Sequence, residues 1–163
     1  KKFRLLNNRQ KAYISGKIDF ELEMMSHEQD SENMLDVLVL TGNMEDGMVL
    51  DSANEERIYC PEYIKKYGER LHCGIRITSN HLNPVYVRND ILGISKKPPR
   101  DGDTCILIHK PTGRAFIRKM QQGNPCHLLP INGYGDIITV DPNNHTDMVQ
   151  WLKFGVVIAV LRR

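Results

Sequence analysis

Residues 77–90 form a short, turn-rich stretch that contains two side chains able to take part in catalysis, Ser79 and His81. A serine hydroxyl attacks a carbonyl carbon only when a neighbouring base removes its proton, and a desolvated lysine can serve as that base. Two basic side chains follow further along the chain, Arg118 and Lys119. They differ in this respect, because a guanidinium group stays protonated and has no lone pair to accept a proton.

Histidine and cysteine side chains are the other groups to consider, since both can bind metal ions. None of the pairs has the short helical or knuckle spacing that zinc sites favour. We therefore predict no metal site and no cofactor. The residues considered are His72, Cys73, His81, His109, Cys126 and His127.

The stretch 77–90 resembles the active-site turn of the C-terminal domain of LexA-type and lambda-type repressors. The usual pattern there is Gly-x-Ser-Met-x-Pro, followed by Gly-Asp six residues after the methionine. On this resemblance His81 takes the place of the serine, and Asn89-Asp90 takes the place of Gly-Asp. Residues 113–120 resemble the family's strand Thr-Val-Lys-Arg-Leu, in which the lysine is catalytic, and Arg118 takes its place.

Further segments fall in register with the same family, so that the resemblance covers roughly residues 38–162. Residues 41–47 contain two glycines that, in these repressors, bracket a self-cleavage site usually written Ala-Gly. Asp46-Gly47 stands at that dipeptide. The remaining similar segments are the turn and strand at 100–108, the segment 128–132 and the closing strand at 154–161.

The resemblance implies a serine-lysine peptidase that has lost its catalytic groups. With His81 and Arg118 at the two catalytic positions, the serine-lysine mechanism is absent. Asp46 would also bring a carboxylate into a pocket that normally receives a small apolar side chain, which is costly for an unpaired charge. We therefore expect a domain that does not cleave itself.

Two alternatives remain open from the residues. In the first, Ser79 and Lys119 form a shifted dyad, although Lys119 would lie on the opposite strand face from Arg118 because side chains alternate. In the second, the vacant cleft near His81 and Arg118 binds an anionic ligand or a peptide, since an arginine can pair a carboxylate bidentately.

The body of the chain reads as a mainly β domain, a small LexA-like fold of partly barrel-like antiparallel sheets. Short apolar or β-branched runs alternate with clusters of Gly, Pro, Asn and Asp. Helix is predicted at 60–67, with Pro61 in its first turn, and a short turn at 147–151. The predicted strands are 34–40, 74–78, 91–94, 104–108, 114–120, 137–140 and 154–161.

Charge and length indicate the domain organisation. The chain has 163 residues and 40% hydrophobic content, which suits one domain with some surplus. We predict that residues 1–33 are a linker or arm from a missing N-terminal DNA-binding domain, and that residues 34–163 are the LexA-like domain. No apolar run is long enough to span a membrane. The four cysteines lack a paired spacing, which favours a reducing cytoplasm.

The function implied by the resemblance is that of an oligomerisation or regulatory domain in a bacterial or phage helix-turn-helix repressor. Such a protein binds operator DNA through its N-terminal domain and dimerises through its C-terminal domain. The last strand is the best candidate for the contact of a homodimer, through Val156, Val157, Ile158 and Val160. Without self-cleavage, induction would come from an anti-repressor protein or a small ligand.

Overall fold

The computed structural model describes residues 32–43 and 47–162, and the expected arm at 1–33 lies outside them except for Glu32 and Asn33. The fold is mainly β, as predicted. The strands are β1 (Met34–Asn43), β2 (Gly47–Tyr59), β3 (Cys73–Ile77), β4 (Ile91–Ser95), β5 (Thr104–His109), β6 (Arg114–Gln121), β7 (Cys126–Pro130), β8 (Ile138–Val140) and β9 (Trp151–Leu161). The helices are α2 (Pro61–Tyr67), the 3-10 helix η2 (Gly68–Arg70) and α3 (His145–Gln150).

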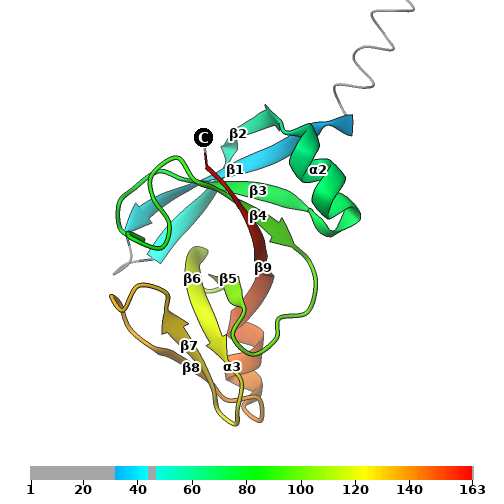
Figure 1. Ribbon diagram of the computed structural model, residues 1–163. Helices are drawn as coiled ribbons and strands as arrows, with labels where there is room; N and C mark the ends of the chain where they lie inside the picture. Colours follow the sequence, from blue (N-terminus) through cyan, green and yellow to red (C-terminus); the bar gives the residue numbers. More distant parts are fainter. Residues whose placement is uncertain (1–31, 44–46, 163) are drawn as a thin grey trace, which may run out of the picture.

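The nine described strands form one sheet in the order β2-β1-β3-β4-β9-β5-β6-β7-β8. Figure 1 shows two groups of strands, β1 to β4 with α2 and β5 to β8 with α3, and β9 runs from one group to the other. β2 also pairs with β6, at Met48 and Ala115. This extra pairing curls the sheet into a ring that is not evenly closed.

The crossing of β9 depends on a close approach at Gly155. The first half of β9 pairs with β5, as far as Cys105 opposite Val156, and the second half pairs with β4, from Ser95 opposite Val156. A Cβ atom on Gly155 would overlap the Ile94 side chain and lie 2.8 Å from the Ser95 carbonyl oxygen. Only glycine therefore fits where the strand changes partner.

Three groups of buried side chains form the core. The largest lies between the two groups of strands and includes Ile75, Leu92, Ile106 and Ile117, all fully buried. The second lies between α2 and the strands β1, β2 and β4. The third lies on the other face of β5 and β6, and its members are Cys105, Leu107, Met120, Leu128 and Val156.

Every predicted strand is present, but two observed strands were not predicted. β2 contains the polar run Asp51 to Arg57, which has no apolar alternation, and it pairs with β1 through residues 47–51 and 56–59. β7 is short and ends in Pro130. The predicted helix at 60–67 is present as α2, and the turn expected at 147–151 is the end of α3. Within residues 32–43 and 47–162, no helix is long and apolar enough to cross a membrane.

Candidate functional site

The turn between β3 and β4 is anchored by side chains that enter the main core. Leu82 is fully buried there, and Tyr86 is 7% exposed. At its start, the Thr78 hydroxyl donates a hydrogen bond of 2.5 Å to the Leu40 carbonyl oxygen of β1. Alternation of apolar and polar residues in the turn thus buries Leu82 and leaves its neighbour His81 exposed.

His81 is held through its backbone. Its carbonyl oxygen accepts a hydrogen bond of 2.8 Å from the Asn132 side-chain amide, which also donates to the Asn83 carbonyl oxygen at 3.1 Å. In the part of the chain that the structure describes, no hydrogen bond or ion pair involves the His81 imidazole. The ring is therefore accessible to solvent and to a ligand.

The turn ends at a buried carboxylate. Asp90 is 2% exposed and accepts a hydrogen bond of 2.9 Å from the Val87 backbone N–H. The Arg162 guanidinium Nε lies 3.1 Å and 3.2 Å from the two Asp90 oxygens, and Arg162 also donates to the Val85 carbonyl oxygen. Asn89 has φ 74°, a left-handed conformation that asparagine tolerates better than most residues. Arg162, which follows β9, therefore holds the middle and the end of the turn.

Arg118 lies within the sheet and is only 2% exposed. Its guanidinium donates to the Ile117 carbonyl oxygen at 2.9 Å and to the Asp136 carbonyl oxygen at 3.4 Å, and stacks 5.4 Å from the Phe116 ring centre. Burial lowers the pKa of Arg118, and the nearby Asp136 carboxylate opposes that shift. The group nevertheless remains a cation at neutral pH, because its ordinary pKa is so high.

The loop 131–137 connects the two predicted catalytic positions. Its Asn132 bonds the backbone at His81, and its Asp136 carbonyl accepts from Arg118. Across the described ranges, no hydrogen bond or ion pair joins His81 to Arg118 directly. The structure thus brings both residues to one loop without forming a catalytic pair.

The shifted dyad, Ser79 with Lys119, is not joined by any contact in the described residues. Lys119 is exposed, whereas its neighbour Arg118 is buried, as the alternation of side chains along β6 requires. Ser79 is half-buried at the start of the turn. No hydrogen bond orients either group toward the other.

Only the second residue of the expected cleavage dipeptide, Asp46-Gly47, is described by the structure. Asp46 lies outside the described residues, and Gly47 is the first residue of β2, opposite Asn43. The next residue, Met48, is 2% exposed and stands opposite Ala115 of β6. The backbone that follows the dipeptide is therefore held against the strand that carries Arg118.

The residues predicted for the dimer contact lie on β9, where Val156 pairs with both β4 and β5, and Val157 and Val160 pair with β4. Val156 is 1% exposed, and the side chains of Val157, Ile158 and Val160 are half-buried against the core groups. Among the described residues, the pairing of β9 with β5 ends at Val156, so that beyond it β9 is paired with β4 along one edge. The homodimer through this strand stays a prediction.

The histidines and cysteines considered as metal ligands lie apart. His109 contacts the Trp151 ring and the Thr112 hydroxyl, and His127 lies 3.2 Å from the Thr139 hydroxyl. Among residues 32–43 and 47–162, no three His, Cys, Asp or Glu side chains are placed to hold a metal ion. Cys73 and Cys105 are buried, which raises the pKa of each thiol to about 11.

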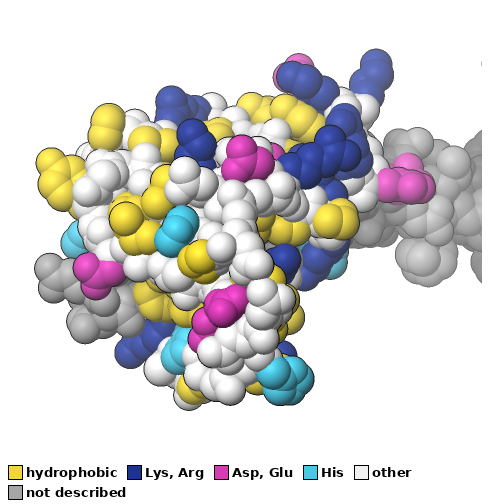
Figure 2. All heavy atoms as spheres, turned by 90° about the horizontal axis from the view of Figure 1, so that it is seen from below, with side chains coloured by type: hydrophobic (Ala, Val, Ile, Leu, Met, Phe, Trp, Pro, Cys, Tyr) yellow, Lys and Arg dark blue, Asp and Glu magenta, His cyan; other side chains and the backbone are white. Residues whose placement is uncertain are grey.

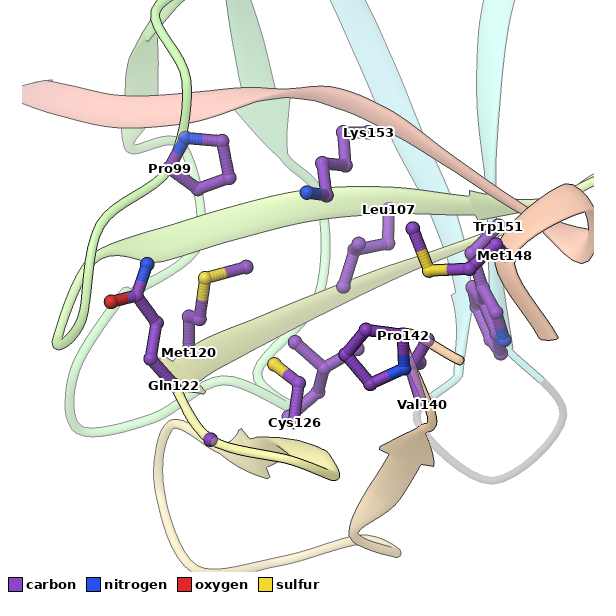
Figure 3. A pocket seen from close by; sticks show the side chains of 12 residues that line it. Pro99, Leu107, Met120, Gln122, Cys126, Val140, Pro142, Met148, Trp151 and Lys153 are labelled. Carbon is purple, nitrogen blue, oxygen red and sulfur yellow. The ribbon is translucent and has the colours of Figure 1, made fainter. Parts of the chain in front are cut away.

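One feature was missed by the sequence interpretation. A pocket of about 350 Å³ opens on the face of β5 and β6 that carries the third core group. Leu107 and Met120 lie along one wall, and Trp151 lines one end (Figure 3). Leu128 also lines the pocket. No sequence motif predicts this pocket, because its lining residues come from segments spread between residues 99 and 153.

Comparisons with known proteins add no family assignment. The chain matches no protein-family model. A search of curated proteins found no similar sequence.

Proposed function

We propose that this chain is the oligomerisation and regulatory domain of a helix-turn-helix transcriptional repressor of bacterial or phage type, and that it does not cleave itself. Its role is to hold two DNA-binding domains together on one operator. Two linked domains bind a palindromic site far more tightly than one, because the second binding step is intramolecular.

The buried guanidinium of Arg118 is the observation that carries the non-cleaving part of this proposal. In the resembling family, a buried lysine at this position removes the proton from the serine. Arg118 is also buried, at 2% exposed, yet a guanidinium cannot accept a proton, and an exposed histidine stands where the serine would be. Such a site has neither the nucleophile nor the base.

Two backbone features support the resemblance itself. The left-handed conformation of Asn89 accounts for glycine being usual at that position in the family's Gly-Asp turn. The pairing of Met48 with Ala115 joins the start of β2 to the strand that carries Arg118, which is the proximity that a cleavage segment would need. The sequence pattern had aligned the Asn89 position, whereas it left open on which side Met48 would lie.

The partners of the proposed domain follow from its role. They are a second copy of the chain, operator DNA bound through an N-terminal domain, and an anti-repressor protein or small ligand that releases the repressor. Basic, acidic and apolar side chains are interspersed on the face in Figure 2, and the net charge is only +2. These charges favour an N-terminal domain, rather than this one, as the DNA-binding part. A cytoplasmic location is part of the same proposal.

Alkaline incubation tests the proposal, because high pH deprotonates an active-site lysine. The purified chain is followed by intact mass and by sedimentation, and we expect an uncut dimer. A cut after Asp46 would refute the non-cleaving part, and a monomer at all concentrations would refute the oligomerisation part. Circular dichroism at each pH shows that the protein remains folded during the incubation.

A reconstructed active site tests whether residues 46, 81 and 118 are correctly aligned with the family's cleavage site, serine and lysine. The triple variant Asp46→Ala, His81→Ser, Arg118→Lys restores the family's groups at all three positions. We expect it to cut itself between residues 46 and 47 at alkaline pH. The matched control carries His81→Ala in place of His81→Ser and should remain intact, because it has the lysine without the nucleophile.

A further inference from the structure

The pocket on the β5 and β6 face has the size and lining of a small-molecule site. Its volume is about 350 Å³, whereas voids in a well-packed protein interior rarely exceed a water molecule. Leu107, Met120 and Leu128 line the pocket and are at most 5% exposed. Pro142 and Met148 are exposed at the rim, so that the pocket is open to solvent.

A cation lies at the edge of this apolar pocket. In Figure 3, Lys153 and Pro99 lie on one side of the pocket, and Cys126 and Pro142 lie on the other. Within the described part of the chain, no acidic side chain pairs with Lys153. Its charge is therefore available to a ligand that occupies the pocket.

Lys153 also lines a neighbouring cleft of about 200 Å³, which shares Pro99 with the pocket. Two more lysines line this cleft, but both are engaged. Lys96 donates to the Phe154 carbonyl oxygen at 2.9 Å and lies over the Phe154 ring, and Lys97 is 3.7 Å from Asp103. The apolar pocket therefore opens toward a positively charged cleft, with Lys153 at the junction.

We propose that this pocket binds a small apolar molecule that carries one carboxylate. The apolar body lies against Leu107, Met120 and Leu128, and the carboxylate faces the Lys153 ammonium group. At about 30 Å³ for each water-sized group, the pocket accommodates about a dozen non-hydrogen atoms. A saturated or aromatic monocarboxylate of that size matches both the volume and the charge. Neither His81 nor Arg118 lines this pocket, and the proposal does not depend on the proposed function.

The chain contains a natural reporter for the test. Trp151 is its only tryptophan and lines the pocket. We would titrate the full chain with decanoate, which is ionised at neutral pH, below the concentration at which it aggregates. Tryptophan fluorescence and titration calorimetry are recorded in parallel, with decanol as the neutral probe of the same length. We expect saturable decanoate binding by both measurements, with decanol binding more weakly.

Two variants test the two parts of the site separately, the charge contact at Lys153 and the apolar pocket at Val140. Lys153→Met should weaken decanoate binding about threefold to tenfold and leave decanol binding unchanged, since it removes only a charge contact. Lys65→Met, on α2, is the matched control and should change neither. Val140→Phe fills the pocket and should abolish binding of both probes, whereas Leu152→Phe adds the same ring at an exposed position of β9 and should not.

Each of the following outcomes would refute one part of the ligand proposal. If neither fluorescence nor heat saturates, the pocket does not bind this class of ligand. If Lys153→Met and the wild-type protein bind decanoate equally, the carboxylate does not face Lys153. If a folded Val140→Phe variant still binds, the ligand lies elsewhere. Should Val140→Phe fail to fold, Lys153→Met decides alone, because Lys153 is exposed and its replacement leaves the core intact.

Discussion

The buried carboxylate of Asp90 offers a quantitative test of how the turn at residues 78–90 is held. Asp90→Ala removes the acceptor of the Val87 N–H and the partner of Arg162 at the same time. Both contacts connect the end of the turn to its surroundings, one within the turn and one to the C-terminal part of the chain. Their loss should therefore destabilise the fold as well as loosen the turn.

The expected cost is about 3 kcal/mol in the free energy of unfolding. A hydrogen bond from a backbone N–H to a buried carboxylate contributes about 2 kcal/mol. The Arg162 side chain is 57% exposed, so solvent screens the ion pair and its contribution is about 1 kcal/mol. Arg162→Met should accordingly cost about 1 kcal/mol, with part of its effect vanishing when Asp90 is already replaced.

Urea unfolding at neutral pH, followed by circular dichroism, measures these differences. Asp101→Ala is the matched control, since the exposed Asp101 also accepts a backbone hydrogen bond, from Gln122 at 2.8 Å, and should cost at most about 1 kcal/mol. A loss below about 1 kcal/mol for Asp90→Ala would refute the reasoning. It would mean that the cost of burying the carboxylate cancels its contacts.

Gly155→Ala should destabilise the protein by about 1 to 3 kcal/mol, because the added methyl group overlaps Ile94 and Ser95. The matched control is Gly102→Ala, which should lower the free energy of unfolding by only about 1 kcal/mol, since its surroundings are open and only its φ of +82° opposes a side chain. Urea unfolding measures both variants, and equal losses of stability would contradict the packing argument. Burial of the Cys105 thiol raises its pKa from 9.0 to about 11, so the folded state keeps the proton longer than the unfolded chain. The free energy of unfolding should therefore fall as pH rises from 9.0 towards 11, with a smaller fall in Cys105→Ala; an identical fall in both would show that this thiol is not responsible.

Most of the sheet could be predicted because local composition determines it. The runs that became β3, β4 and β5 are apolar and β-branched, and turn residues separate them. β2 could not be found in this way, since its middle is polar, and its two ends are held by pairing with β1 and, at Met48, with β6. A strand held by its partner's hydrogen bonds leaves little pattern in its own residues.

The candidate site was also predicted only in part, for the same reason. Sequence spacing identified His81 and Arg118 as the positions to compare with a serine-lysine pair, and strand alternation placed Lys119 on the face opposite Arg118. It could not show that Arg118 is buried against backbone carbonyls, or that Asn132 bonds the backbone of His81 from 51 residues away. Sequence spacing also could not predict the pocket beside Lys153, because six separate elements and their loops contribute its lining residues.

The sequence by itself determined the mainly β class, the strands with apolar cores, helix α2 and the chemical inability of Arg118 to act as a base. These properties depend on residue type and on spacing over a few residues. The tertiary structure alone decided that β9 crosses between the two groups of strands, that Asp90 pairs with Arg162, and that an apolar pocket opens beside an unpaired cation. Each of these depends on contacts between residues far apart in the chain, and such contacts exist only once the whole sheet has formed.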